Sequence, residues 1–387
     1  MEVGKHRNRK CNPLLKYLGN HITLEFKINL LNKNPIAFVD ALKDNSTLKS
    51  LTLKQGYERI QASGLSAIAD VLRVNSTLTS INLSGIGIGD KGAICISESL
   101  KVNSSLTSLH LGDNYINKMG AKAIADSLEV NSSLTSLNLE WNHIEEEGAI
   151  SIADTVKVNS SLTYLNLGLN SIRTDGALAI AVALKVNSTI KSLDLSANFI
   201  SKEGAIAIAD ALKVNSSLTS LNLHRNCSRE VGAIAIADTL KVNSSLASLN
   251  LGKNSIQKEG GFAIADALKV NSSLTSLNLA GNSIQKEGAI AIADALKVNT
   301  SLASLNLGQR NSTSCHGLLS IAEALTYNPT LLHLEINKIR KPIHSGIQDF
   351  LNTSDNLKNL LQNLIGEDGA QVLGVAFCIK SRCVRLV

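Results

Sequence analysis

Residues 274–301 read LTSLNLAGNSIQKEGAIAIADALKVNTS, and the chain repeats this wording with small changes every 28 residues. A fixed period of this length is typical of a solenoid, in which each repeat packs only on its neighbours. We therefore predict an elongated array without one enclosed active-site cavity. The apolar residue that opens each repeat stands at Leu78, Leu106, Leu134, Leu162, Ile190, Leu218, Leu246, Leu274 and Leu302.

Residues 190–217, IKSLDLSANFISKEGAIAIADALKVNSS, show how one repeat is expected to fold. Alternating Ile190, Leu193 and Leu195 predict a short strand with one buried face. The apolar spacing that follows Gly204 predicts a helix with one buried side. On its outer side Asp and Lys stand three residues apart and can pair, as Asp210 with Lys213, Asp238 with Lys241, Asp266 with Lys269 and Asp294 with Lys297.

An asparagine follows each strand at the point where the chain turns towards the helix. Its amide can bind backbone groups that the turn leaves without partners. The residues at this position are Asn114, Asn142, Asn170, Asn198, Asn226, Asn254 and Asn282.

Stacked repeats of this kind must curve. Parallel strands lie about 4.8 Å apart, whereas packed helices need roughly 8–10 Å between their axes. The predicted fold class is therefore an α/β solenoid with parallel strands on the concave face and helices on the convex face. The usual handedness of strand–helix–strand connections predicts a right-handed horseshoe.

The strings LxxLxLxxNxI and GAxxIAxAL resemble those of leucine-rich repeats, and the repeat length with a full helix is similar to the ribonuclease-inhibitor-like class. The wording Asn-x-Ile, Gly-Ala and Ala-Leu-Lys-x-Asn is most similar to the leucine-rich region of NOD-like receptors. This resemblance implies a non-enzymatic scaffold or sensor that binds a protein partner on its concave face.

The repeats do not span the whole chain. We assign residues 1–20 to a basic tail, 21–47 to an N-terminal cap and 48–331 to about ten repeats of 28–30 residues. The period fails after Leu331, so residues 332–387 are expected to form an irregular C-terminal cap with a degenerate last repeat at 357–373. A solenoid needs such caps because its end repeats lack a neighbour.

Composition and charge narrow the class of partner. Aromatic residues make up only 3% of the chain, so Leu, Ile, Val and Ala must build the core. The net charge of +6 comes from the two ends, residues 1–20 and 376–387. A nucleic-acid reader would carry a basic stripe along the repeats, so we expect no nucleic-acid partner. No apolar stretch is long enough for a membrane span, and we expect no membrane association.

The cysteines indicate the cellular compartment in which the protein is found. They occupy different positions of the repeat and form no regular pattern, which favours free thiols and a cytoplasmic or nuclear location. They are Cys11, Cys95, Cys227, Cys315, Cys378 and Cys383.

Asn-x-Ser/Thr recurs where each helix is expected to end. Such a row would accept glycans on a secreted protein, but asparagine is also favoured as a left-handed residue at a helix C-terminus. We favour the cap. The residues are Asn75, Asn103, Asn131, Asn159, Asn187, Asn215, Asn243, Asn271 and Asn299.

The sequence offers little for catalysis or cofactor binding. Gly87, Gly89 and Gly92 match the spacing of a dinucleotide-binding fingerprint. Gly92, however, occupies the position at which other repeats also have a glycine at the start of the helix, so we do not interpret the match as a nucleotide site. The chain lacks a GxxxxGK[ST] phosphate loop, an HExxH motif and paired CxxC motifs. We therefore predict no enzyme activity, no cofactor, no metal and no small-molecule substrate.

Protein binding is the predicted function, because exceptional side chains interrupt a wall of Thr, Ser and Asn. Trp141 and Tyr164 are the expected anchors. Alternatives are a regulator of a small GTPase similar to Ran GTPase-activating protein, a ribonuclease-inhibitor-like enzyme blocker, and a purely structural array. The candidate partner-binding residues are His110, Asp113, Tyr115, Glu140, Trp141, His143, Tyr164, Leu169, Asp194, His224 and Arg225.

Overall fold

The computed structural model describes residues 23–56, 58–308, 311, 313–325 and 327–336. The predicted basic tail at 1–20 and most of the predicted C-terminal cap, including residues 357–373, lie outside these ranges. The chain divides into two compact units, residues 1–198 and 199–387.

The first unit alternates strands and helices. Its first elements are β1 (Thr23–Lys27), α2 (Ile28–Lys33), α3 (Pro35–Lys43), β2 (Ser50–Lys54), α4 (Ala62–Val74), β3 (Ser80–Asn82) and α5 (Gly89–Leu100). They are followed by β4 (Ser108–His110), α6 (Lys118–Leu128), β5 (Ser136–Asn138), α7 (Glu145–Val156), β6 (Tyr164–Asn166), α8 (Arg173–Val186) and β7 (Ser192–Asp194).

The second unit repeats the same alternation. Its elements are α9 (Lys202–Leu212), β8 (Ser220–Asn222), α10 (Arg229–Leu240), β9 (Ser248–Asn250), α11 (Gln257–Leu268), β10 (Ser276–Asn278), α12 (Gln285–Leu296), β11 (Ser304–Asn306), α13 (Ser314–Leu325) and β12 (His333–Glu335).

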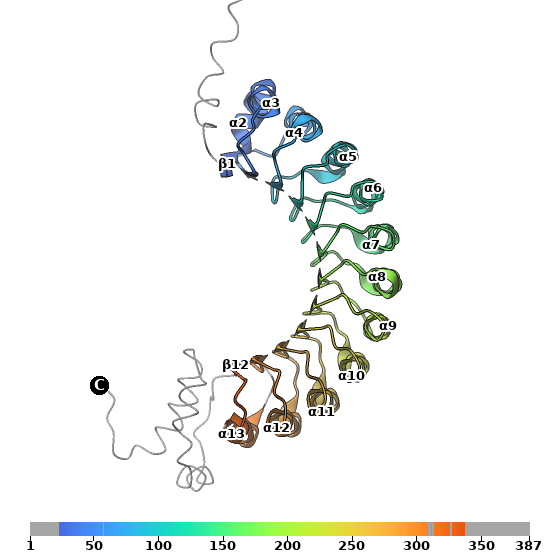
Figure 1. Cartoon of the computed structure of the whole chain (residues 1–387), viewed down its shortest axis with the longest axis vertical. Coiled ribbons are helices and arrows are strands. Elements are labelled where there is room, and N and C mark those ends of the chain that lie inside the picture. The colour runs from blue at the N-terminus through green and yellow to red at the C-terminus, as the bar shows by residue number, and fades with distance from the viewer. Residues whose placement is uncertain (1–22, 57, 309–310, 312, 326, 337–387) are drawn as a thin grey trace, which may run out of the picture. The chain divides into compact units, whose positions relative to one another are not determined.

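Within each unit the strands are parallel, and each pairs with the strand of the next repeat. The register follows the sequence period, so that Leu109 stands opposite Leu137 and Leu137 opposite Leu165. The helices lie on one side of the strands and pack on one another in chain order (Figure 1). The predicted fold class, a leucine-rich-repeat α/β solenoid with strands and helices on opposite sides, is confirmed.

The sheet extends beyond the predicted repeats. In the expected N-terminal cap, β1 pairs in register with β2 over its full length, Thr23 opposite Ser50. In the expected C-terminal cap, β12 pairs with β11, His333 opposite Ser304. The sequence hides both strands because their flanking loops depart from the repeat wording, whereas the backbone ladder requires only that a strand lies alongside.

The asparagine after each strand binds backbone groups of the turn, as predicted, and it also connects neighbouring repeats. Asn142 is 3% exposed, and its Oδ1 accepts hydrogen bonds from the backbone N–H groups of Asn114 and Ile116 at 3.0 and 2.9 Å. Its Nδ2 donates to the carbonyl oxygens of Leu111 and Leu139 at 3.0 and 2.9 Å. One buried amide therefore satisfies backbone groups of its own loop and of the preceding one.

The asparagine that follows each helix acts differently from the prediction. Asn75 and Asn187 have extended backbones, with φ of −79° and −75°, and are not left-handed caps. Asn131 shows the common role: its Nδ2 donates to Leu100 and Asn103 of the preceding repeat, and its Oδ1 accepts from the backbone N–H of Leu134 at 2.9 Å. The side chain bridges two repeats, which leaves the extended backbone free to enter the next strand.

The predicted Asp–Lys pairs on the helices are present. Lys213 Nζ lies 2.8 Å from Asp210 Oδ1, and Lys241, Lys269 and Lys297 form the corresponding pairs. The first three pairs are exposed and that of Lys297 is partly so, and each contributes little to stability. They serve mainly to keep the helical surface polar.

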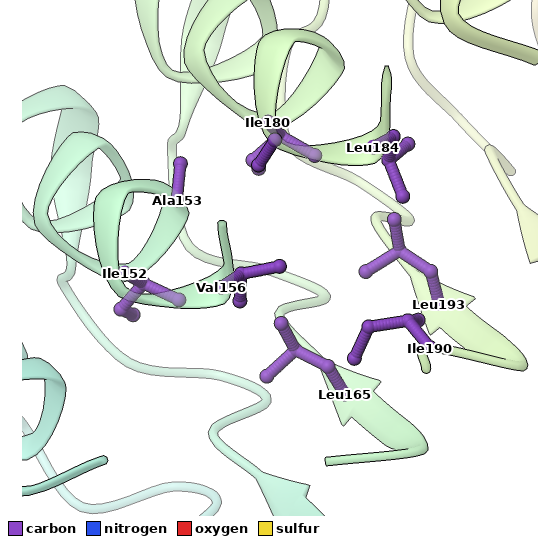
Figure 2. Close-up of a pocket in the computed structure, with 9 residues that line it drawn as sticks. Ile152, Ala153, Val156, Leu165, Ile180, Leu184, Ile190 and Leu193 are labelled. Carbon is purple, nitrogen blue, oxygen red and sulfur yellow. The ribbon is translucent and has the colours of Figure 1, made fainter. Parts of the chain in front are cut away.

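The core of the first unit contains a small packing defect. A cavity of about 10 Å³ lies between α7, α8, β6 and β7, and Figure 2 shows Val156, Leu165, Leu184 and Leu193 around it. Most repeats place leucine where Val156 stands, for example Leu128 and Leu184. Valine has one methylene fewer than leucine, and the surrounding residues do not fill the space that this leaves. Such a gap is unusual because protein interiors pack densely.

We predict that Val156→Leu stabilises the first unit by about 0.5–1 kcal/mol, because it adds one buried methylene in an existing gap. Urea unfolding monitored by circular dichroism measures this. The reverse change one repeat earlier, Leu128→Val, is the control and should destabilise by a similar amount. A loss of stability in Val156→Leu would mean that the gap is too narrow for leucine.

We also predict that Asn142→Ala destabilises the fold by about 3 kcal/mol or more, because it leaves buried backbone groups of two repeats without partners. The control is Asn138→Ala, since Asn138 is only half-buried and its Oδ1 accepts the Glu140 N–H at 2.8 Å within its own repeat. Equal unfolding free energies for the two variants would contradict the bridging role of Asn142.

Candidate protein-binding surface

The open face of the first unit is the side of its sheet that faces away from the helices. The central residue of each three-residue strand is buried, and the residues on either side of it are half-buried, except Asn166 of β6, which is buried. Three predicted site residues, His110 on β4, Tyr164 on β6 and Asp194 on β7, occupy such outward positions. The alternation of a strand places them there without any further constraint.

The register sets the neighbours of these residues. Tyr164 stands between Ser136 and Ser192, and Asn166 stands opposite Asp194. The phenol ring therefore rises from a row of small side chains. Its small neighbours leave part of the ring accessible for contact with a partner.

Glu140 follows β5 and joins this group. The Nδ2 of Asn166 donates to Glu140 Oε2 at 3.3 Å. Burial raises the pKa of the Tyr164 phenol; a hydrogen bond with Asn166 opposes this, and the nearby charges of Asp194 and Glu140 add to it. The structure thus brings Tyr164, Glu140 and Asp194 together, as their places in the repeat suggested.

A second group of predicted residues lies in the loops after the strands, which we call the rim: residues 113–115, 141–143 and 169–171. Asp113, Trp141 and Leu169 hold the same place in successive repeats and have left-handed backbones, with φ of 54°, 54° and 58°. Trp141 is 62% exposed. These residues follow β4, β5 and β6 and do not lie within the strands.

The left-handed rim is held by backbone hydrogen bonds between repeats. The N–H of Asp113 donates to the Glu140 carbonyl at 2.9 Å, and that of Trp141 donates to the Gly168 carbonyl at 2.9 Å. Left-handed backbone is unfavourable for a bulky residue. The neighbouring repeat imposes it, so a large exposed indole at this place is a feature that the fold tolerates at a cost.

Two aromatic residues of the rim, Tyr115 and His143, lie near each other. Their ring centroids are 6.1 Å apart, and the Arg59 guanidinium lies 4.9 Å from the centroid of Tyr115. Arg59 was missed in the sequence because it precedes the helix of an atypical repeat. Gly87 lines its place, since a Cβ there would contact Arg59 Cδ at 3.4 Å.

His224 and Arg225 belong to the second unit. His224 follows β8, and a Cβ at Gly252 would lie 2.6 Å from its Nδ1, so glycine leaves room for the imidazole. Arg225 is left-handed, with φ of 59°. The other nine predicted residues belong to the first unit, and a single patch formed by all eleven stays a prediction.

The glycine signature at 85–93 is explained by the same rim geometry. Gly85, Gly87 and Gly89 have φ of 72°, 77° and 59°, and equivalent places in other repeats are also left-handed. A Cβ at Gly92 would collide with Ile88 Cγ2 at the helix start. These glycines could have revealed the left-handed rim from the sequence, because glycine adopts positive φ without strain.

The described residues show neither a metal cluster nor a membrane-spanning helix. Within these ranges, no cluster of three or more His, Cys, Asp or Glu side chains is arranged to hold a metal ion. Among the helices described above, none has both the length and the apolar character needed to cross a bilayer. Cys95 and Cys227 are free thiols.

Comparison with known proteins identifies the repeat. A family model described as Leucine Rich repeat matches residues 74–97, 102–125, 130–153, 158–181, 186–209, 242–265 and 270–293. The chain therefore carries leucine-rich repeats. No curated protein sequence matches significantly. The finer resemblance to ribonuclease-inhibitor-like repeats and NOD-like receptors stays a prediction.

Solved structures resemble the chain in part. The leucine-rich repeat-containing protein LegL7 from Legionella pneumophila is 21% identical, covers 77% of this chain and 94% of its own, and has a TM-score of 0.47. A chain of the Rad7 and Elc1 complex in yeast is 16% identical, covers 82% and 85%, and has a TM-score of 0.45. The actin-binding site 2 of leiomodin-1 is 24% identical, covers 38% and 86%, and has a TM-score of 0.35.

We predict that the stability of the first unit depends on pH through His110. Burial lowers the pKa of His110 below its ordinary value of 6.5, so the folded state favours the neutral ring. Its contribution to stability is complete above pH 6.5 and is lost as pH falls through and below that value. Urea unfolding of the wild type between pH 7.5 and 5 measures this, with His110→Asn as control because Asn138 fills the equivalent place. An identical pH dependence in both proteins would contradict it.

Proposed function

We propose that this chain is a non-enzymatic protein-interaction scaffold or sensor whose first unit binds a protein partner through its open face and rim. The leucine-rich-repeat fold suggests a scaffold for protein–protein interaction, and a preordered array loses little conformational entropy on binding. A function similar to the sensor region of NOD-like receptors is part of this proposal, as is an intracellular location.

The observation that carries the proposal is the exposure of large apolar side chains on consecutive rim loops. Tyr115, Trp141 and Leu169 are 49%, 62% and 39% exposed. Trp141 and Tyr115 also keep left-handed backbones, where glycine would be less strained. Neither a strained backbone nor an exposed aromatic side chain stabilises the fold. Binding of a partner therefore explains their presence better than folding does.

The polar surroundings of these anchors suit a protein partner. Thr, Ser and Asn cover most of the open face and can exchange hydrogen bonds with a partner's backbone. Glu140 and Asp194 beside Tyr164 would repel a nucleic-acid backbone, which supports the expectation of a protein partner. The GTPase-regulator and enzyme-blocker alternatives have no separate support on this surface.

We predict that Trp141→Ala weakens capture of the partner by roughly thirtyfold, the effect of losing an anchor of about 2 kcal/mol. The immobilised chain is exposed to an extract of its own source cells, and bound proteins are quantified by mass spectrometry. The thermal midpoint should hardly change, because the indole is exposed.

The matched control is Phe199→Ala. Phe199 is also left-handed, with φ of 57°, and 66% exposed, but it lies in the second unit outside the predicted site. A partner that is retained by Trp141→Ala, or lost equally from both variants, would contradict the proposal. A large fall in the thermal midpoint of Trp141→Ala would instead assign the indole a structural role.

A further inference from the structure

We infer that the first unit binds a second copy of this chain along a row of exposed valines at the ends of its helices. We call Val74, Val102, Val130, Val158 and Val186 the valine row. The inference goes beyond the proposed function and does not rest on it. The valine row precedes the parallel strands and the rim follows them, so the two lie at opposite ends of the sheet.

The valine row is exposed in every repeat that contributes to it. Its five side chains are between 57% and 69% exposed, and they recur at a spacing of 28 residues. Each valine is the last residue of a helix or stands two residues beyond it. Valine is a poorer helix former than alanine or lysine, and at this exposure it adds little to the core. A regular apolar row on the surface is therefore a candidate contact with another molecule.

The row is held rigidly by the buried asparagine that follows each valine. Asn131 Nδ2 donates to the carbonyl oxygens of Leu100 and Asn103 at 2.8 and 2.9 Å. One repeat later, Asn159 Nδ2 donates to those of Leu128 and Asn131 at 2.8 and 3.3 Å. Because these bonds fix the loops before binding, little conformational entropy is lost when a partner covers the valines.

The charges beside the row follow a simple pattern in three of its repeats. There the residue before the valine is basic and pairs with an acidic residue three positions earlier. Lys101 Nζ lies 2.7 Å from Glu98 Oε1, and Lys157 Nζ lies 2.6 Å from Asp154 Oδ1. Pairs of this kind leave no net charge beside the valine.

The other two repeats depart from this pattern with opposite sign. Glu129 stands where the others have the basic residue, and Asp126 pairs with Lys122 instead. Lys185 is basic, but Val182 stands in place of its acidic partner. Both Glu129 and Lys185 are exposed, and among the described residues neither has an ion-pair partner.

The placement of these two charges fits a twofold axis and identifies a second copy as the occupant. Glu129 lies one repeat before Val158, and Lys185 lies one repeat after it. A twofold axis at Val158 lays the row of one chain along the row of its copy in the opposite direction. Glu129 of each chain then faces Lys185 of the other. A second copy thus matches both the spacing of the valines and the order of the charges.

Charge also argues against a lipid surface as the occupant. Arg73, Lys101 and Lys157 beside the row each pair with an acidic residue, and Glu129 adds a negative charge. The row therefore lacks the cluster of basic residues that anionic lipids attract.

The second unit, taken by itself, supplies a matched control surface. Its valines at the same place of the repeat are exposed, and each is preceded by a lysine that pairs with an aspartate. They are Val214, Val242, Val270 and Val298. These four repeats have valines but lack the two opposite charges that specify the contact.

Sedimentation velocity of the full chain at about 1 to 300 μM, a range that covers weak interfaces, tests the inference. We expect a monomer that converts to a dimer as the concentration rises. Val158→Asp should weaken the dimer by about tenfold or more, because it places two carboxylates together at the axis. Val270→Asp is the control, since Val270 is 64% exposed, and it should leave the dimer unchanged.

Charge reversal assigns the contact to the two proposed ion pairs. Glu129→Lys and Lys185→Glu should each weaken the dimer several-fold, because like charges then face each other across the axis. Glu129→Lys combined with Lys185→Glu restores opposite charges and should recover most of the wild-type affinity. Circular dichroism checks that all variants remain folded, as the exposure of the substituted side chains leads us to expect.

Several results would overturn the inference. A wild-type chain that stays monomeric at the highest concentration would do so and would leave the valine row to a different protein. A dimer that survives Val158→Asp, that Val270→Asp weakens equally, or that the double charge reversal fails to restore would do so as well. The capture experiment with Trp141→Ala is independent of these outcomes, because Trp141 belongs to the rim.

Discussion

The buried amide ladder is the interaction on which the structure depends. Asn142 and its counterparts accept hydrogen bonds from the preceding loop and donate to carbonyl groups of both repeats. Backbone groups in a buried turn are costly when left unpaired. One asparagine in each repeat therefore fixes the conformation of the loop and links it to the preceding repeat.

That joint has a consequence for the surface. Because the amide and the inter-repeat carbonyls hold the rim in one backbone conformation, the rim residues keep left-handed φ values irrespective of their side chains. Gly281, Lys253 and Trp141 thus share nearly the same conformation. The chain can vary the side chain at this place without altering the frame, which is how a uniform solenoid acquires a local surface of its own.

The repeats are not equally packed beneath this surface. Val156 and Ile190 both depart from leucine around the cavity of the first unit. The defect lies below β6 and β7, the strands that carry Tyr164 and Asp194. Weaker packing there lowers the cost of small adjustments of these strands, although the hydrogen-bonded register limits their extent.

The sequence by itself determined the repeat length, the strand–loop–helix order, the role of Asn114 and Asn142 in binding backbone groups of the turn, and the Asp–Lys pairs on the helices, because these follow from local periodicity and side-chain chemistry. It also singled out Trp141 and Tyr164. Only the tertiary structure decided that Trp141 belongs to a left-handed rim, that Asn75 bridges repeats from an extended backbone, and that Arg59 stacks on Tyr115. These features arise from contacts between residues of neighbouring repeats. Local sequence patterns do not reveal them, because the contacting residues lie far apart in the sequence.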